Sequence, residues 1–342
     1  MKTATITIAY IGLILSLVSC AERVDPVNNT AETALKVISI SPTPGWTQDV
    51  WVNGNTAFVA DGEQWVGIWD VSQLESPVQI DTLQTLRAVS GVYYSPATDL
   101  IMVDMPSAQG GITYYDLSDK TRINTVFDAG LEGWGFREIS SDTIIVAEVD
   151  RSEGFKVFVI FYDTLESEWI DTEIRGIFQI PYGTARGLHY EGDYGYIAHN
   201  QFGLKIVEVT ISALAVDIVE LGNTDTPGGA RDVALNGDKT HAIIADYQAG
   251  ISIVDIADKS NPEFVTSLLP DGVDKMTEVF AVGDTVYAID NDNGIFAFDV
   301  TKPAEPRIIG RYDSPTPRGM FVSDDHTVYL ADEDIGLIIL GW

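Results

Sequence analysis

The sequence has one cysteine, few basic residues and no long apolar segment. Cys20 is the only cysteine among 342 residues, so no disulfide can form within the chain. Lys and Arg together number 20 against 51 Asp and Glu, which gives a formal net charge of −31. Because so acidic a surface repels a polyanion, nucleic acid is not expected as a partner. The apolar run Ile6–Val18 is shorter than the roughly 20 residues that a membrane-spanning helix needs.

The composition nevertheless predicts a folded protein. Hydrophobic residues make up 45% of the chain and aromatic residues 10%, which is enough to build a large core. Disorder along the whole length is therefore excluded.

The first 19 residues predict a secretory signal peptide. Lys2 precedes the apolar run, and the run ends in small residues before Cys20. Leu17-Val18-Ser19-Cys20 resembles the lipobox of bacterial lipoproteins, which implies cleavage before Cys20 and lipidation of its thiol. A plain secretory signal with an incidental cysteine is the alternative. Ala21 is not the acidic residue of an inner-membrane retention signal, so we expect a cell-envelope protein, anchored at the outer membrane or cell surface.

Three segments are predicted from this reading of the chain. Residues 1–19 are the signal peptide, and residues 20–33 are a lipid-anchored flexible tether, since they have no apolar periodicity. Residues 34–342 are the folded domain, and they contain an internal repeat.

The repeat is marked by apolar runs that end in a polar residue. Seven such residues follow one another at spacings between 42 and 51, and we call them the marker residues: Asp61, Asp104, Glu148, His199, Asp246, Asp290 and Asp332. The runs around them are short, rich in Val, Ile, Tyr and Phe, and bounded by Gly, Pro, Asn and Asp, which is typical of strands joined by tight turns. No stretch shows sustained helical spacing. Four strands per repeat of this length predict a blade, and seven repeats predict an all-β, seven-bladed β-propeller with four antiparallel strands per blade.

The last repeat has only three strands before the chain stops at Trp342. The segment Ser41-Pro42-Thr43-Pro44 recurs as Ser314-Pro315-Thr316-Pro317, where it follows the fourth strand of the sixth repeat. The first copy should therefore also follow a fourth strand. We expect residues 35–40 to pair with residues 336–340 and close the ring, which removes two exposed strand edges.

One repeat carries a family resemblance. Arg231-Asp232-Val233, Ile244-Ala245-Asp246, Ile253-Val254-Asp255-Ile256 and Pro262 together resemble the LVIVD repeat of bacterial surface proteins. The resemblance extends over roughly residues 35–342 and is weakest in the second and third repeats. It implies a β-propeller at the envelope, often lipid-anchored, and it implies no shared activity or catalytic residue.

A ring of polar residues is expected on one face of the propeller. The residue that opens the first strand of each blade should lie beside the marker residue, and we call these the opening residues: Gln48, Ser90, Arg137, Arg186, Arg231, Thr277 and Arg318. The candidate ligand-binding rim comprises Arg137, Glu148, Arg186, His199, Arg231, Asp246, Arg318 and Asp332, with Trp46, Trp134 and Tyr182 in nearby loops. Two interpretations remain open. The arginines could bridge to the markers as structural pairs, or the rim could bind an anionic or polyhydroxyl ligand.

The sequence holds little evidence for a cofactor or for catalysis. Asp290-Asn291-Asp292-Asn293-Gly294 resembles the first half of a calcium loop, but Thr301 stands where the loop needs Glu. A plain turn is the favoured interpretation, with calcium at Asp290 and Asp292 as the alternative. No Gly-x-Ser-x-Gly motif occurs. We therefore predict a non-enzymatic, lipid-anchored module that binds a protein or glycan. The alternative is a propeller hydrolase or lyase with its site at the channel mouth, calcium-assisted or with His199 and Glu148 as a general-base pair.

Overall fold

A computed structural model describes residues 33–105, 111–120, 122–127, 131–140, 143–150, 154–163, 168–171, 176–180, 184–212 and 216–342. Residues 32–342 make one compact unit. Within the described residues, no helix is long and apolar enough to cross a membrane. Cys20, the predicted tether as far as residue 32 and Tyr182 lie outside the described residues.

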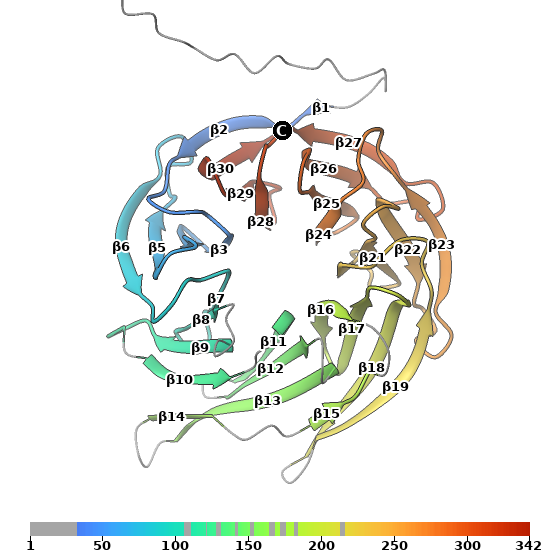
Figure 1. The fold of residues 1–342 in the computed structure, drawn as a ribbon, viewed down its shortest axis with the longest axis horizontal. Helices are drawn as coiled ribbons and strands as arrows, with labels where there is room; N and C mark the ends of the chain where they lie inside the picture. Colours follow the sequence, from blue (N-terminus) through green and yellow to red (C-terminus); the bar gives the residue numbers. More distant parts are fainter. Residues whose placement is uncertain are drawn as a thin grey trace, which may run out of the picture. The chain divides into compact units, whose positions relative to one another are not determined.

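Seven antiparallel sheets follow one another around a central axis, as Figure 1 shows. Blade 1 consists of β3 (Asp49–Asn53), β4 (Thr56–Ala60), β5 (Trp65–Asp70) and β6 (Val78–Gln84), and blade 2 of β7 (Gly91–Ser95), β8 (Leu100–Met105), β9 (Gly111–Asp116) and β10 (Arg122–Phe127). Blade 3 consists of β11 (Leu131–Ser140), β12 (Thr143–Asp150), β13 (Gly154–Asp163) and β14 (Glu168–Asp171), and the short strand β15 (Gly176–Phe178) also pairs with β13.

Blades 4 to 7 repeat the pattern. Blade 4 consists of β16 (Ala185–Glu191), β17 (Tyr194–His199), β18 (Gly203–Ile211) and β19 (Val216–Thr224), and blade 5 of β20 (Asp232–Leu235), β21 (His241–Ala245), β22 (Ile251–Asp255) and β23 (Glu263–Leu268). Blade 6 consists of β24 (Met276–Val282), β25 (Thr285–Asp290), β26 (Gly294–Asp299) and β27 (Arg307–Tyr312). Blade 7 consists of β28 (Pro317–Val322), β29 (Val328–Asp332), β30 (Gly336–Gly341) and β2 (Lys36–Ser41). The predicted seven-bladed propeller is confirmed.

The ring closes as the recurrence of Ser-Pro-Thr-Pro predicts. Strand β2 pairs antiparallel with β30, with Val37 opposite Leu340 and Ile40 opposite Ile338. The sequence did not predict β1 (Thr33–Ala34), which lies parallel to β27 at the outer edge of blade 6. The chain therefore contacts blade 6 before it completes blade 7 (Figure 1).

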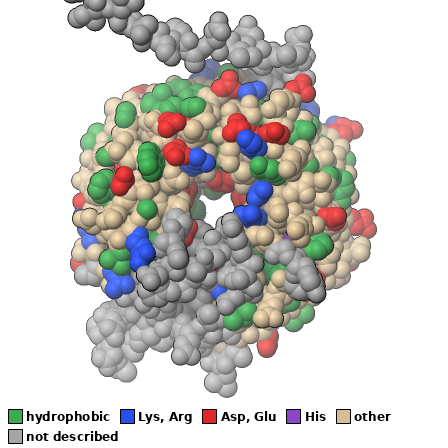
Figure 2. All heavy atoms as spheres, in the orientation of Figure 1, with side chains coloured by type: hydrophobic (Ala, Val, Ile, Leu, Met, Phe, Trp, Pro, Cys, Tyr) green, Lys and Arg blue, Asp and Glu red, His purple; other side chains and the backbone are tan. Residues whose placement is uncertain are grey.

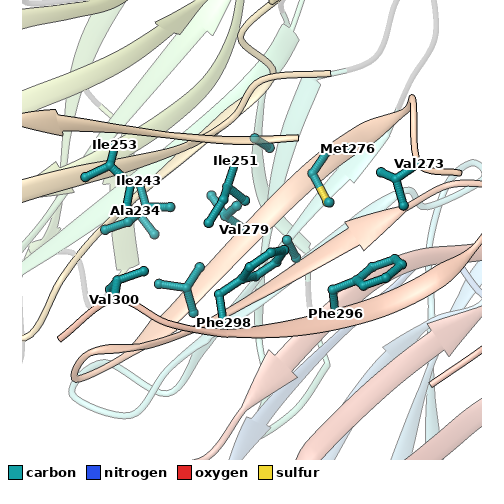
Figure 3. Close-up of a cluster of buried hydrophobic side chains, with 13 residues drawn as sticks. Ala234, Ile243, Ile251, Ile253, Val273, Met276, Val279, Phe296, Phe298 and Val300 are labelled. Atoms are coloured by element: carbon teal, nitrogen blue, oxygen red, sulfur yellow. The ribbon is translucent and has the colours of Figure 1, made fainter. Parts of the chain in front are cut away.

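The hydrophobic core lies between blades rather than inside them. Among the described residues, six clusters of buried side chains each combine residues of two successive blades, at the junctions 1–2, 3–4, 4–5, 5–6, 6–7 and 7–1. Between blades 5 and 6, for example, Ile243 and Ile253 pack with Phe296 and Phe298 (Figure 3). One thin sheet cannot cover its own two faces, so each blade depends on its neighbours.

A glycine begins the third strand, or directly precedes it in blade 5, in each of the last four blades, and the structure explains why. These glycines have φ between 69° and 107°, and a Cβ atom would lie within 2.5 Å of a backbone oxygen at each of them: Gly203, Gly250, Gly294 and Gly336. Only glycine tolerates both the backbone conformation and the close approach.

The first and second strands meet at one face of the ring. The backbone N–H of Arg231 donates to the carbonyl of Ala245 at 2.8 Å, which places this opening residue beside the marker Asp246. The corresponding bond runs from Gln48 to Ala60 in blade 1. We call this side of the ring the rim face.

Candidate functional site

A cavity of about 810 Å³ runs along the central channel. Its described lining comes from the first strands of blades 1, 2, 4, 5, 6 and 7 and the residues directly before them, together with Asp104 and Asn291. Figure 2 shows the opening, with basic side chains at its edge. A concave space that collects side chains from many strands is the usual form of a small-ligand site.

The opening residues surround this cavity. Three of them are arginines and three are uncharged: Arg186, Arg231, Arg318, Gln48, Ser90 and Thr277. The seventh, Arg137, belongs to β11, as does Trp134, and the side chains of both lie outside the described residues.

The marker residues lie beneath the rim rather than on it. Glu148, His199, Asp246 and Asp332 are all completely buried. Asp104 is the partial exception, since its side chain also lines the cavity. Sequence reasoning placed these groups beside the arginines, but it could not distinguish a buried position from an exposed one.

Buried marker carboxylates hold the linkers that lead into their own blades. Asp246 accepts hydrogen bonds from the Thr226 hydroxyl at 2.9 Å, the Gly228 N–H at 3.0 Å and the Ser252 hydroxyl at 2.7 Å. Burial raises the pKa of Asp246, and these hydrogen bonds act in the opposite direction. The carboxylate is thus part of the architecture and its oxygens are already engaged.

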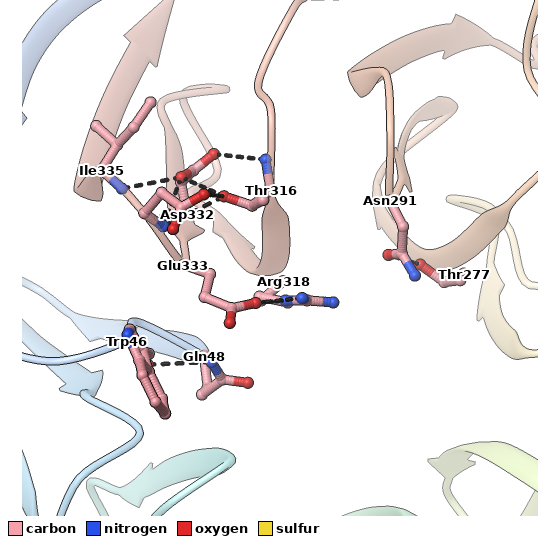
Figure 4. A network of polar contacts seen from close by, with 10 residues as sticks. Trp46, Gln48, Thr277, Asn291, Thr316, Arg318, Asp332, Glu333 and Ile335 are labelled. Atoms are coloured by element: carbon pink, nitrogen blue, oxygen red, sulfur yellow. Dashed lines mark hydrogen bonds and ion pairs between the residues drawn. The ribbon is translucent and has the colours of Figure 1, made fainter.

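Blade 7 repeats this arrangement. Asp332 accepts from the Thr316 N–H at 3.2 Å and hydroxyl at 2.9 Å, and from the backbone N–H groups of Asp334 and Ile335 at 3.0 Å each (Figure 4). In blade 1, Asp61 similarly accepts from the Gly45 N–H and from the indole N–H of Trp65.

Three opening residues contact the residue that follows the marker, whereas the Ser90 hydroxyl donates to its marker Asp104 itself at 2.6 Å. Arg318 pairs with Glu333, directly after Asp332, and the Thr277 hydroxyl donates to the Asn291 side-chain oxygen at 2.8 Å (Figure 4). The Arg231 guanidinium lies over the Tyr247 ring, 4.4 Å from its centroid. This position, one residue beyond the marker, is a partner that the sequence did not predict.

Blades 3 and 4 carry different buried groups at the marker position. Glu148 lies 3.7 Å from the Lys156 ammonium, with both side chains buried. His199 accepts the Gln201 N–H at its Nδ1 atom over 3.3 Å and packs against Phe202. Burial lowers the pKa of His199, which favours the neutral imidazole.

Among the aromatic residues of the predicted rim, Trp46 is the one whose side chain lies within the described residues. Its side chain is 63% exposed, and its carbonyl accepts a hydrogen bond from the Gln48 amide at 3.1 Å (Figure 4). An indole ring kept in solvent beside the channel mouth offers a flat surface for stacking.

The oxygens of the calcium candidates take part in a turn. Asp290 accepts from the Lys275 N–H at 2.8 Å, the Asp292 N–H at 3.1 Å and the Asn293 amide at 2.6 Å. Asp292 forms an ion pair with the Lys275 ammonium. Among the described residues, no three His, Cys, Asp or Glu side chains are placed to hold a metal ion.

A second layer of the channel contains carboxylates that the sequence analysis missed. Asp49, Asp232 and Glu278 directly follow the opening residues of blades 1, 5 and 6, and all three line the cavity. Loss of hydration raises the pKa of Asp49 to about 7 and that of Asp232 to about 6. The same cause raises the pKa of Glu278, and the negative charges of the other two add to it. An alignment of the repeats at the position directly after the opening residue would have shown these three acidic residues.

The repeat itself is identified by comparison with known families. Four segments match the model described as the LVIVD repeat, at residues 44–85, 182–226, 227–269 and 275–314. The chain carries LVIVD repeats. The matching segments correspond to blades 1, 4, 5 and 6, which confirms the resemblance for these four repeats, while no segment of blades 2, 3 or 7 is matched.

Comparison with solved structures supports the fold alone. A structure of U3-55K has a TM-score of 0.64 at 10% identity, covering 91% of this chain and 100% of that chain. The computationally designed Ika8 protein has a TM-score of 0.59 at 10% identity, covering 90% and 100% respectively. No curated protein matches the chain.

Proposed function

We propose that the protein is a non-enzymatic binding module, held at the cell envelope by lipid on Cys20, that binds a glycan at the mouth of its channel. The observation that carries this proposal is the cavity of about 810 Å³ whose mouth is lined by arginine, amide and hydroxyl groups. Such side chains hydrogen-bond to sugar hydroxyls, and an exposed indole such as that of Trp46 stacks on the apolar face of a sugar ring.

The state of the marker residues supports binding rather than catalysis. Glu148 has Lys156 as its buried neighbour, and His199 is buried within blade 4. Asp246 and Asp332 accept several hydrogen bonds each from their own blade. A general base needs to reach the proton that it abstracts, and these groups are directed into the protein.

One observation favours a second candidate, a hydrolase or lyase at the channel mouth. Asp49 lines the cavity, and its pKa is raised to about 7 because it has lost hydration. A carboxyl group with a pKa near neutral pH is partly protonated there, so it can donate a proton as a general acid. A polysaccharide that the protein shortens, with activity lost in Asp49→Asn, would establish this candidate in place of simple binding.

The binding proposal is tested with the purified protein on a panel of immobilised glycans, followed by calorimetry with the best ligand. We expect saturable binding that weakens at least about ten-fold in Trp46→Ala or Arg186→Gln, because both changes remove contacts at the mouth. Phe264→Ala is the control, since Phe264 is 40% exposed on β23, the outermost strand of blade 5. Unchanged affinity in both mouth variants would contradict the proposal.

The anchor is tested separately. Cells that express the protein are fed an alkyne fatty acid, and the labelled protein is detected in membrane fractions. Cys20→Ser should remove the label and release the protein from the membrane. A labelled Cys20→Ser variant would contradict a lipid anchor at this thiol.

A further inference from the structure

Aromatic rings form a continuous arc along one side of the channel. Phe280, Phe321, Trp51 and Tyr93 belong to the first strands of blades 6, 7, 1 and 2, three residues after each opening residue. Their ring centroids are 5.6 Å apart for Phe280 and Phe321, 5.0 Å for Phe321 and Trp51, and 4.5 Å for Trp51 and Tyr93. We call these four residues the aromatic arc.

Three rings of the arc face the cavity. Trp51, Tyr93 and Phe280 line it and remain partly exposed, while Phe321 packs between Trp51 and Phe280 and fixes their positions. Apolar surface left uncovered inside a channel is surface that a ligand can bury, and a rigid arc presents it at little entropic cost.

The described part of the opposite wall is uncharged at this level. Ala234 and His189 hold the equivalent positions in blades 5 and 4, and both line the cavity. Burial lowers the pKa of His189 to about 4, so its imidazole is neutral at pH 7. The short side chain of Ala234 leaves space in front of the rings.

Carboxylates lie next to two of these rings. Asp49 is two residues before Trp51 in β3, and Glu278 is two residues before Phe280 in β24. Alternate residues of a strand project from the same face, about 7 Å apart along the strand. Asp49, Glu278 and Asp232 accept backbone N–H groups of neighbouring blades, and within the described side chains no Lys or Arg pairs with them.

We propose that the channel binds an organic ammonium ion, whose cationic head lies against Trp51 and Phe280 beside the carboxyl groups of Asp49 and Glu278, which give up their protons as the ion binds. An aromatic face attracts a cation through its quadrupole, most strongly where water is excluded, and alkyl groups on the nitrogen bury the rings' apolar surface. The net charge of −31 concentrates cations around the protein and favours their entry. This site is deeper than the glycan site proposed at the mouth and does not depend on it.

The test uses two molecules of equal shape. Choline chloride and its neutral isostere 3,3-dimethylbutan-1-ol are titrated into the purified protein by calorimetry at about pH 8, above the pKa of about 7 of Asp49, and at an ionic strength held constant with NaCl. We expect saturable binding of choline and at least about ten-fold weaker binding of the neutral alcohol. Equal affinities, or no saturable binding of choline up to about 50 mM, would overturn the proposal.

Variants locate the site. Glu278→Gln retains an oxygen for the Met320 N–H but cannot ionise, and Trp51→Leu removes one ring of the arc. Each should weaken choline binding about ten-fold, and Asp49→Asn replaces Glu278→Gln if that variant does not fold. Asp299→Asn is the matched control, because it removes a carboxylate from the same blade at the far end of β26.

Two results separate this proposal from its alternatives. If Asp299→Asn weakens choline binding as much as Glu278→Gln does, the ion is held by the general negative charge and the proposal fails. Glycan binding measured on the same samples should survive Glu278→Gln, so failure of the ammonium site and failure of the mouth site can be distinguished.

Discussion

The Oδ2 atom of Asp49 in blade 1 accepts a hydrogen bond of 3.0 Å from the backbone N–H of Val92 in blade 2. Two further junctions have the same bond, from Val279 to Asp232 and from Met320 to Glu278. Each carboxylate thus links its blade to the next one around the ring. The hydrogen bond stabilises the junction between the blades. The negative charge of the same carboxylate is poorly hydrated in the channel and destabilises the fold.

Asp49→Asn should stabilise the protein above pH 7. The folded-state pKa of about 7 lies above the usual value of 3.8, so between these pH values the folded chain binds more protons than the unfolded chain. This carboxyl group therefore stabilises the fold less as pH rises from about 4 to about 7. Asparagine keeps an acceptor for Val92 without the charge. We expect a gain of about 1–3 °C in Tm at pH 8 and none at pH 4.

Asp81→Asn is the contrasting variant for that experiment. The hydrogen bond and ion pair with Lys120 lower the pKa of Asp81, so its charge is favourable in the folded state. Its removal should give no gain in Tm at pH 8. A pH-independent effect of Asp49→Asn would show that the charge of Asp49 is not the cause.

Gly228→Ala should destabilise the linker into blade 5. A Cβ atom at Gly228 would lie 1.9 Å from the carbonyl oxygen of the marker Asp246, so the linker would have to move away from the carboxylate that holds it. We expect a loss of about 1–3 kcal/mol in the free energy of unfolding, measured in urea. Gly341→Ala is the control, because there the Cβ would meet only the flexible side chain of Ile38. Equal losses would contradict this account of the linker.

Lys156→Met should be strongly destabilising. It leaves the Glu148 carboxylate buried without its ammonium neighbour, and breaking a buried ion pair in this way costs about 3–5 kcal/mol. The double variant Glu148→Gln with Lys156→Met removes both charges and should recover much of the loss. A double-mutant cycle by thermal unfolding checks this, and additive losses would show that the two charges do not interact.

Ring closure depends on Ile38, which stands at an irregularity in the pairing of β2 with β30, between Val37 and Ser39. Ile38 packs against the cluster between blades 7 and 1, whereas Ile40 on the same strand is 48% exposed. Ile38→Asp should therefore lower Tm by several degrees, since it places a charge against apolar neighbours. Ile40→Asp should change Tm by less than about 1 °C. A similar loss in both variants would contradict the observed register of β2.

The blades and the closure could be predicted because they depend on local pattern. Marker spacing, turn residues and the recurrence of Ser41-Pro42 as Ser314-Pro315 are properties of the chain itself. They determine the number of strands and their pairing before any side chain is placed. The position of β1 on β27 could not be predicted in this way, because a two-residue strand has no pattern of its own.

The site was predicted only in part, for a physical reason. Sequence spacing places Arg318 near Asp332, but the path of the linker decides that Asp332 is buried and that Glu333 receives the arginine. The predicted roles of Arg137, Trp134, Tyr182 and Cys20 stay predictions. The aromatic arc was missed because its members are far apart in the chain and meet only when four blades are arranged around the axis.

Small residues in the second layer restrict the order of the blades. A Cβ atom on Gly319 would lie 2.5 Å from the Asp49 carboxylate, and one on Gly187 would lie 2.7 Å from that of Asp232. At both junctions, a blade with aspartate directly after its opening residue follows a blade with glycine at that same position. The repeats are consequently not interchangeable modules. Gene shuffling or engineering that transposes blade 4 and blade 5 would separate the Gly187 position from Asp232, and the second-layer side chains at the new junctions would no longer fit one another.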